Sequence, residues 1–157
     1  QNYDEKKFVS ISQANLDLDS EEEKKEIEEK TAENKDMLTA MKDALADKVK
    51  EVRISSRLID DPVCIVADEG VSLDMERYMA NDPMNKDRAI TATKILEINP
   101  NHPIFNKLRE VSTSSPDKLK EYTDVLYDQA LLIEGLPIKN PVEFAKKITN
   151  LIVDAKN

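Results

Sequence analysis

Glycine, cysteine, histidine and aromatic residues are all scarce in this chain of 157 residues. It has 2 Gly, 1 Cys, 1 His and no Trp, and aromatic residues make up 4%. One cysteine excludes an internal disulfide framework, and two isolated glycines exclude the glycine-rich loops that bind phosphate. No apolar run approaches the roughly 20 residues needed to cross a bilayer. The composition therefore favours a helical scaffold with an aliphatic core over an aromatic-lined substrate pocket.

Acidic residues outnumber basic ones by 32 to 23, which gives a net charge of −9. Such a chain repels phosphate backbones and anionic lipids, so roles on nucleic acids or membrane surfaces are disfavoured. The length suits one domain, or one domain with a short appendage. The first residue is Gln1 and no signal-peptide pattern follows it. We therefore expect a piece of a longer protein.

Apolar patterning predicts several strands. A short strand is expected over residues 7–11, and period-two alternation predicts another over 49–59, with Val52, Ile54, Ser56 and Leu58 on its buried face. The β-branched run 63–67 indicates a strand covered on both faces, or a hairpin partner of the strand before it. A third strand of this group is expected over 93–98.

Helical spacing predicts five helices. One long helix is expected over residues 20–48, where a capping box at Ser20 precedes a run without Gly or Pro, and only its less charged second half can be packed. A short helix over 72–80 is followed by a polar stretch, 81–91, interpreted as a mobile loop. The other three are a short helix after His102, a helix from Pro116 to Glu134 that ends at Gly135, and a helix that begins at Asn140.

Catalytic and metal-binding chemistry has little support. His102 lies in a turn between Asn101 and Pro103, where a residue that begins a helix is the simpler interpretation. Cys64 lies in an apolar strand without a basic neighbour in sequence, which favours a buried structural thiol. A small enzyme that uses His102 as acid or base stays open as an alternative function.

The short helix carries an apolar stripe at Val71, Met75, Tyr78 and Met79. Spacing alone favours packing against the sheet, because such stripes are usually buried. Methionine is flexible and frequent on adaptable binding faces, and Leu73 on the opposite side could anchor the helix and leave the stripe exposed. Both interpretations stay open.

The last two predicted helices form an amphipathic hairpin. Val125, Leu131 and Leu132 widen the apolar surface of the first helix beyond one stripe, so it needs more than one neighbour. Two hairpins related by a two-fold axis would form a four-helix bundle. The alternative is that the pair covers its own sheet in a monomeric structural domain, and the sequence does not decide between them.

Several segments together resemble the C-terminal domain of the ninety-kilodalton heat-shock chaperone family, in its bacterial form. They are KVKEVRISSRL (48–58), DPVCIV (61–66), MER (75–77), KILEINPNHP (94–103) and DQALLIEG (128–135). The resemblance runs from about residue 8 to residue 153 and covers nearly the whole chain.

The resemblance implies an α+β fold: a small mixed three-stranded sheet with flanking helices, a long N-terminal helix, and a C-terminal helical pair that forms a four-helix bundle across a dimer. It implies that residues 1–19 end the preceding middle domain or form a linker, and that residues 20–157 are the dimerisation and client-contact domain. ATP and magnesium would bind the N-terminal domain of the full-length protein, so this part would hold no cofactor and catalyse no reaction.

The resemblance also assigns partners and residues. It implies a homodimer, unfolded or partly folded client proteins, and a bacterial cytoplasmic location, in a heat-shock chaperone of the stress response. The chain ends VDAKN and lacks the MEEVD tail that docks tetratricopeptide co-chaperones, so these should not bind. The implied client-binding residues are Val71, Met75, Tyr78 and Met79. The implied dimer-interface residues are Tyr122, Val125, Leu126, Gln129, Leu132, Ile133, Phe144, Ile148, Leu151 and Ile152.

Overall fold

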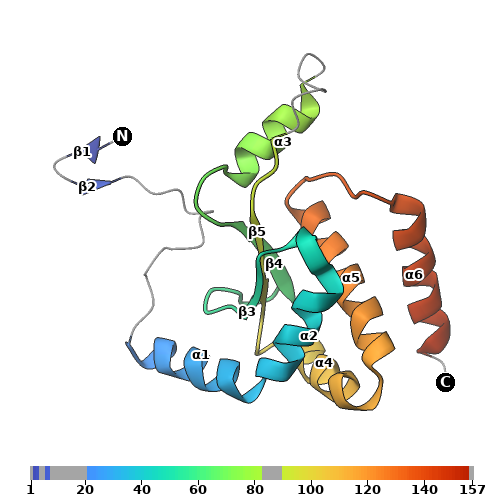
Figure 1. Cartoon of the computed structure of the whole chain (residues 1–157). Coiled ribbons are helices and arrows are strands. Elements are labelled where there is room, and N and C mark those ends of the chain that lie inside the picture. Colours follow the sequence, from blue (N-terminus) through green and yellow to red (C-terminus); the bar gives the residue numbers. More distant parts are fainter. Residues whose placement is uncertain (1, 4–5, 8–20, 83–89, 156–157) are drawn as a thin grey trace.

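The computed structural model describes residues 2–3, 6–7, 21–82 and 90–155 (Figure 1). Within this part of the chain, six α-helices accompany a small three-stranded sheet, so the predicted α+β class is confirmed. The elements are β1 (Asn2–Tyr3), β2 (Lys6–Lys7), α1 (Glu21–Glu33), α2 (Lys35–Leu45), the 3-10 turn η1 (Ala46–Lys48), β3 (Glu51–Ile54), β4 (Val63–Ala67), α3 (Leu73–Asn81), β5 (Lys94–Ile98), α4 (Pro103–Ser114), α5 (Pro116–Ile133) and α6 (Pro141–Asp154).

The three-stranded sheet has the order β3-β5-β4. β5 runs parallel to β3 and antiparallel to β4, and Leu96 at its centre lies between Val52 and Ile65. The sheet is therefore mixed. β4 pairs with β5 and not with β3, so the hairpin alternative for these two strands is wrong. Four of the five residues of β4 are buried, in agreement with a strand covered on both faces.

β3 ends at Ile54, well before the predicted end of this strand. The hydroxyl of Ser55 accepts hydrogen bonds from the backbone N–H groups of Arg57 and Leu58, at 3.2 and 3.3 Å. Such local side-chain bonds to the backbone stabilise a turn in place of a continued ladder. Ser55 is consequently buried and Ser56 exposed, which is the reverse of the predicted alternation.

The long helix predicted over residues 20–48 is two helices, because the chain bends at Asn34 between α1 and α2 (Figure 1). Asn34 has φ −112° and ψ 17°, and its side-chain amide donates to the carbonyl of Lys30 at 2.7 Å. The same carbonyl also accepts from the Asn34 backbone N–H (3.1 Å), and a second bond of this kind, from a side chain to the carbonyl four residues earlier, often bends a helix. The predicted difference in packing is confirmed, because α1 buries no side chain and α2 buries four. These four are Met37, Leu38, Met41 and Leu45.

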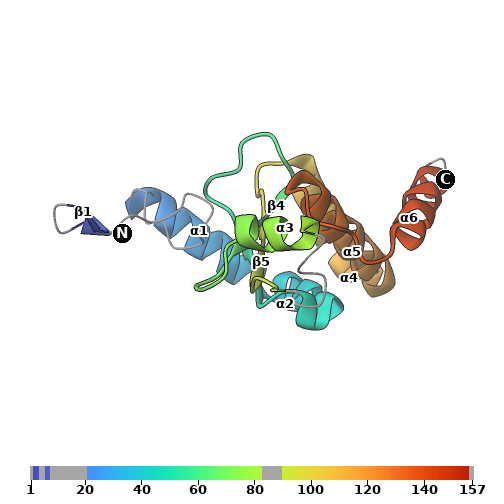
Figure 2. The same cartoon turned by 90° about the horizontal axis from the view of Figure 1, so that it is seen from above.

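The helices are not spread evenly around the sheet. α2 packs on β3 and α5 on β4, with α4 against both helices, so these three cover one face (Figure 1). α3 lies at one end of the sheet, and α6 lies outside α5 (Figure 2). The core between the sheet and the helices contains fully buried Met41, Leu45, Leu96 and Leu108.

The predicted helix ends are confirmed where they depend on local chemistry. His102 Nδ1 accepts a hydrogen bond from the backbone N–H of Ile104 (3.1 Å) at the start of α4. Asn140 Oδ1 accepts a hydrogen bond from the backbone N–H of Glu143 (3.2 Å) at the start of α6. Gly135 follows α5 with φ +68°, a left-handed conformation that glycine adopts without strain.

Some predictions fall outside the described residues. Of the strand expected over 7–11, only Lys7 is described, in β2, which pairs with β1. Residues 83–89 of the stretch interpreted as a loop also lie outside, and the domain boundary at residue 19 stays a prediction. No helix in the described ranges combines the length and apolar character needed to span a membrane.

Candidate functional site

The first candidate surface is the exposed side of α3. Leu73 is 2% exposed and points into the core, whereas Met75 and Tyr78 are 50% and 68% exposed. Val71 and Met79 are half-buried, and Val71 packs against the core. Packing of the whole stripe against the sheet is therefore wrong. Leu73 anchors the helix, and the methionine side faces outward.

Two charged side chains hold α3 against neighbouring elements. Glu76 accepts hydrogen bonds from Lys94 Nζ on β5 (2.6 Å) and from the backbone N–H of Ala92 (2.8 Å). Arg77 donates from Nη1 to the carbonyl oxygen of Glu134, just past the end of α5 (2.7 Å). Polar contacts to β5 and α5 therefore position α3 together with one buried leucine.

The second candidate surface belongs to α5 and α6. α5 packs against β4, α2 and α4, and α6 packs mainly against α5. None of the side chains of α6 is buried. The alternative in which the helical pair covers its own sheet therefore holds for α5 alone. The buried apolar residues of α5 are Leu119, Val125, Leu126, Tyr127, Ala130 and Leu131.

Apolar side chains stay exposed on α6 and at the end of α5. Leu132 and Ile133 are each more than half exposed, and Ile152 is 61% exposed. Val142 and Val153 are equally exposed but lie outside the stripe that the sequence predicted. Half-buried Phe144, Ile148 and Leu151 continue this surface along α6.

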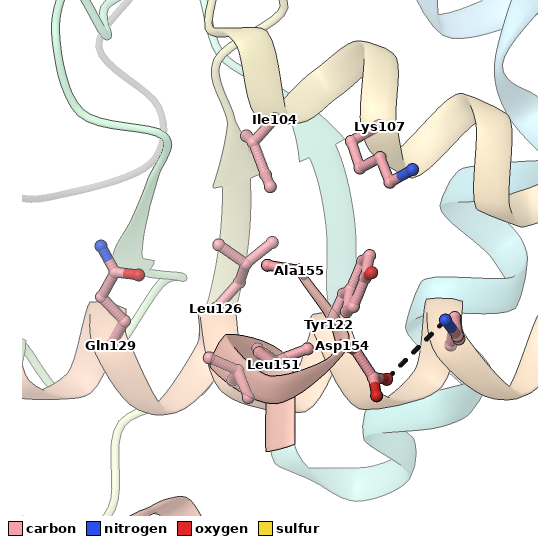
Figure 3. Close-up of a pocket in the computed structure, with 10 residues that line it drawn as sticks. Ile104, Lys107, Tyr122, Leu126, Gln129, Leu151, Asp154 and Ala155 are labelled. Atoms are coloured by element: carbon pink, nitrogen blue, oxygen red, sulfur yellow. Dashed lines mark ion pairs between the residues drawn. The ribbon is translucent and has the colours of Figure 1, made fainter. Parts of the chain in front are cut away.

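A groove of about 630 Å³ lies between α6, α4 and the side of α5 that carries residues 118–129. Figure 3 shows Leu126 of α5 and Leu151 of α6 beside it, with Ile104 of α4 on the far wall. At one end Lys118 pairs with Asp154 across the groove, at 3.7 Å. The groove is apolar at its centre and charged at its rim.

The structure brings five of the ten predicted dimer-interface residues together around this groove. They are Tyr122, Val125, Leu126, Gln129 and Leu151. Val125 and Leu126 are already buried within one chain, so they form the floor of the groove and offer little free surface. The sequence did not indicate Ile104, because α4 reaches the groove only through tertiary packing.

One carboxylate ties α6 to the body of the molecule. Asp124 of α5 accepts hydrogen bonds from Lys48 of η1 and Lys147 of α6, both at 3.0 Å. Burial alone would raise the pKa of Asp124, but the two lysines outweigh burial and lower the pKa below its usual value. Lys147 also pairs with Glu143 within α6, at 3.2 Å.

A second buried carboxylate, Glu97, organises the other face of the sheet. It binds Arg53 (2.6 Å), Arg57 (3.0 Å) and the hydroxyl of Ser55 (3.0 Å). Burial opposes its charge, but the arginines more than offset this and lower the pKa of Glu97. Burial, then the adjacent Glu97 charge, raises the pKa of Cys64 to about 12, although Arg57 is a basic neighbour that sequence proximity did not indicate. A thiol with this pKa is a poor nucleophile.

The enzyme alternative gains no support from the geometry of His102. Its Nδ1 caps α4 through the Ile104 N–H, as a residue that begins a helix does. Among residues 21–82 and 90–155, no group of three or more His, Cys, Asp or Glu side chains is arranged to hold a metal ion.

Comparison with known proteins identifies similar sequences. The family model described as "Hsp90 protein" matches residues 1–156. "Chaperone protein HtpG" of Bacillus subtilis is 46% identical over 151 residues, 96% of this chain and 24% of that protein. The protein of the same name from Oceanobacillus iheyensis is 47% identical over 152 residues, and that from Clostridium perfringens 44% over 151. The chain spans about a quarter of the length of these relatives.

Proposed function

The chain belongs to the Hsp90 family of chaperones, and on this premise we propose that it is the C-terminal dimerisation and client-contact domain of a bacterial member. Its role in the full-length chaperone is to join two copies permanently and to hold client proteins. ATP and magnesium bind in the N-terminal domain, so the chain itself holds no cofactor and catalyses no reaction.

The observation that carries this proposal is the shallow packing of α6. The helix has an apolar side, yet it buries no side chain within the described chain. Burying an exposed Leu, Ile or Val side chain contributes about 1.5 to 3 kcal/mol, so an uncovered helix of this kind gains most from a partner. A second copy of the same hairpin supplies a matching apolar surface.

Two-fold pairing of α5 and α6 with their copies forms a four-helix bundle. In a two-fold interface the same patch is used twice, so one exposed row on α6 can pack in the groove of the partner chain. The groove is open and apolar at its centre, near Leu126 and Leu151. Its charged rim at Lys118 and Asp154 fits the polar edge that surrounds most interfaces.

Permanent pairing has a mechanical use in an ATP-driven chaperone. When two arms are joined at one end, closure of their distant N-terminal domains becomes intramolecular and occurs at a high effective concentration. Weak contacts between those domains are then sufficient for a regulated clamp.

The exposed side of α3 supports the client-contact part of the proposal. Met75 and Tyr78 offer apolar surface on a helix whose position is otherwise fixed. Flexible methionine side chains adapt to different sequences, which gives broad but weak binding. Clients are therefore unfolded or partly folded proteins that expose apolar segments.

The remaining partner assignments follow from charge and from the family. A net charge of −9 disfavours nucleic acids and anionic membranes as partners. The bacterial origin of the relatives supports a cytoplasmic location.

Sedimentation equilibrium over a wide concentration range tests self-association. The chain is compared with a double variant, Leu132→Glu with Ile152→Glu, whose changes fall on residues that are 51% and 61% exposed. We expect the chain to be a dimer and the variant to dissociate at least about 100-fold more readily, because the interface would bury four unpaired carboxylates, two from each copy.

Ile59→Glu is the matched control, because Ile59 is 85% exposed and follows β3, away from the hairpin. This control should dimerise as the unchanged chain does, and circular dichroism should show that all three proteins are folded. A chain that stays monomeric at every concentration contradicts the proposal.

A further inference from the structure

The two candidate surfaces share a contact at Arg77. This residue lies on α3, between the exposed Met75 and Tyr78 in sequence. Its side chain reaches the end of α5. Its Nη1 donates to the carbonyl of Glu134 at 2.7 Å, and its Nη2 pairs with Asp74. One guanidinium therefore connects the helix proposed to bind clients with the helix proposed to pair the chains.

The contact satisfies a group that the helix leaves unpaired. The last carbonyl groups of an α-helix have no partner within the helix and carry partial negative charge. The Glu134 carbonyl lies at this end of α5, and a cation is favourable there. Arg77 thus contributes to the stability of the terminal turn of α5.

The arginine stem also packs on the turn itself. A Cβ atom placed on Gly135 would lie 3.3 Å from Cδ of Arg77, so the stem covers this glycine closely. The N–H of Gly135 donates to the carbonyl of Leu132 (3.0 Å), and the N–H of Leu136 donates to that of Leu131 (2.9 Å). These bonds close the turn, and buried Leu136 then directs the chain toward α6.

α3 itself has few other attachments. Of its nine residues only Leu73 is buried, and its other polar anchor, Glu76, joins it to Lys94 and Ala92. A helix held by so few contacts opens locally with less free energy than the core. When α3 unfolds locally, the turn after α5 also loses its contact with the Arg77 side chain.

We propose that Arg77 is a positioning residue that makes α3 and the α5–α6 turn one cooperative unit, so that a protein bound to α3 stabilises the pairing hairpin. The functional half of this inference rests on the proposed function. Because linkage is reciprocal, pairing of the hairpins must strengthen client binding by the same factor. Coupling of this kind needs only a change in local opening, with no rearrangement of the fold.

Hydrogen exchange tests the cooperative unit without any client or dimer. Ser72→Ala removes the side chain that caps α3 through the Met75 N–H and so destabilises this helix alone. We expect it to accelerate exchange at the Gly135 and Leu136 amides about fivefold, since coupling energies of this kind amount to 5-fold or more. In the Arg77→Ala background the same change should accelerate exchange on α3 and leave these two amides unaffected.

The amide of Leu96 in the central strand is the internal reference, because its exchange follows global unfolding. Arg109→Ala, which removes an exposed arginine from α4, is the control for loss of a cation. Equal acceleration at Gly135 and Leu136 with and without Arg77 would overturn the proposal, as would no acceleration in either background.

Sedimentation in the presence of a permanently unfolded test protein, reduced and carboxymethylated α-lactalbumin, measures the functional consequence. The test protein should tighten dimerisation about fivefold in the unchanged chain and have no effect in Arg77→Ala. A dimer that the test protein tightens equally in both chains contradicts the coupling. Failure to dimerise or to bind the test protein contradicts the proposed function, while the exchange experiment still decides the cooperative unit.

Discussion

Asp124 shows how a single residue positions a whole element. α6 buries none of its own side chains, and its Lys147 forms an ion pair with Asp124 of α5 at 3.0 Å. Lys48 holds the same carboxylate from η1, so three elements meet at one side chain. The Asp124 side chain is 13% exposed, and a charge so shielded from water interacts more strongly than one on the surface.

We predict that Asp124→Asn lowers the free energy of unfolding by about 1 to 2 kcal/mol, because two lysines lose a charged acceptor. The folded state lowers the pKa of Asp124, so its contribution is complete above the unfolded value of about 3.9 and is lost as the pH falls through the folded value. Urea unfolding from pH 7 to pH 3 should therefore show a shallower acid slope for the variant.

Asp154→Asn is the control for this prediction. Asp154 is half exposed and pairs with Lys118 at 3.7 Å, so its loss should change stability by less than about 0.5 kcal/mol. A similar loss of stability in both variants, or an unchanged acid slope in Asp124→Asn, would show that Asp124 does not anchor α6.

At the scale of residues, local chemistry was predictable and distant pairing was not. The capping roles of His102 and Asn140 follow from neighbours within three positions, and both are confirmed. Asp124 pairs with Lys48, which is 76 residues away in sequence, and Glu97 pairs with Arg53, which is 44 residues away. No spacing rule in the sequence connects such pairs, because the fold alone brings them together.

Elements were predicted well where periodicity was long and poorly where one polar side chain ended them. The amphipathic patterns of α5 and α6 predicted both helices, and the structure confirms them, with α5 ending at Ile133, one residue before its predicted end. Asn34 and Ser55 each bind nearby backbone groups, and this divides a predicted helix and shortens a predicted strand. Apolar periodicity carries no signal for such bonds, because both residues are also compatible with the continued element.

The exposed side of α3 gives a prediction at the scale of elements. Met75→Asp with Tyr78→Asp should weaken binding of a fluorescently labelled unfolded protein, measured by anisotropy, at least about tenfold. The reason is that both side chains offer apolar surface, which a carboxylate removes. Because neither residue is buried, the free energy of unfolding should change by less than about 0.5 kcal/mol.

Ile59→Asp removes an apolar side chain that is just as accessible but lies away from α3. If this control weakens binding as much as the double variant does, general exposure of apolar surface binds the test protein and α3 has no special role. If neither weakens it, clients bind elsewhere on the chain.

Among the described residues, exposed apolar side chains gather at two separate places, on α3 and on the α5–α6 pair. α3 lies at one end of the sheet, whereas α6 lies outside α5, so a partner can occupy each surface without displacing the other (Figure 2). The chain belongs to the Hsp90 family and spans about a quarter of the length of the relatives it matches. If the chain is the C-terminal domain, as proposed, it should not bind ATP, because we propose that ATP binds in the N-terminal domain.

We predict that ATP with magnesium leaves the thermal unfolding midpoint of the isolated chain unchanged. A ligand at ten times its Kd stabilises the folded state by about 1.4 kcal/mol, which raises the midpoint of a domain of this size by about 3 to 5 °C. The chain offers only Gly70 and Gly135, too few for the glycine-rich loops that bind phosphates. Sodium triphosphate with magnesium controls for nonspecific effects of a polyanion. A saturable rise with ATP alone would mean that the chain carries a nucleotide site, and the proposed position at the C-terminal end would then be wrong.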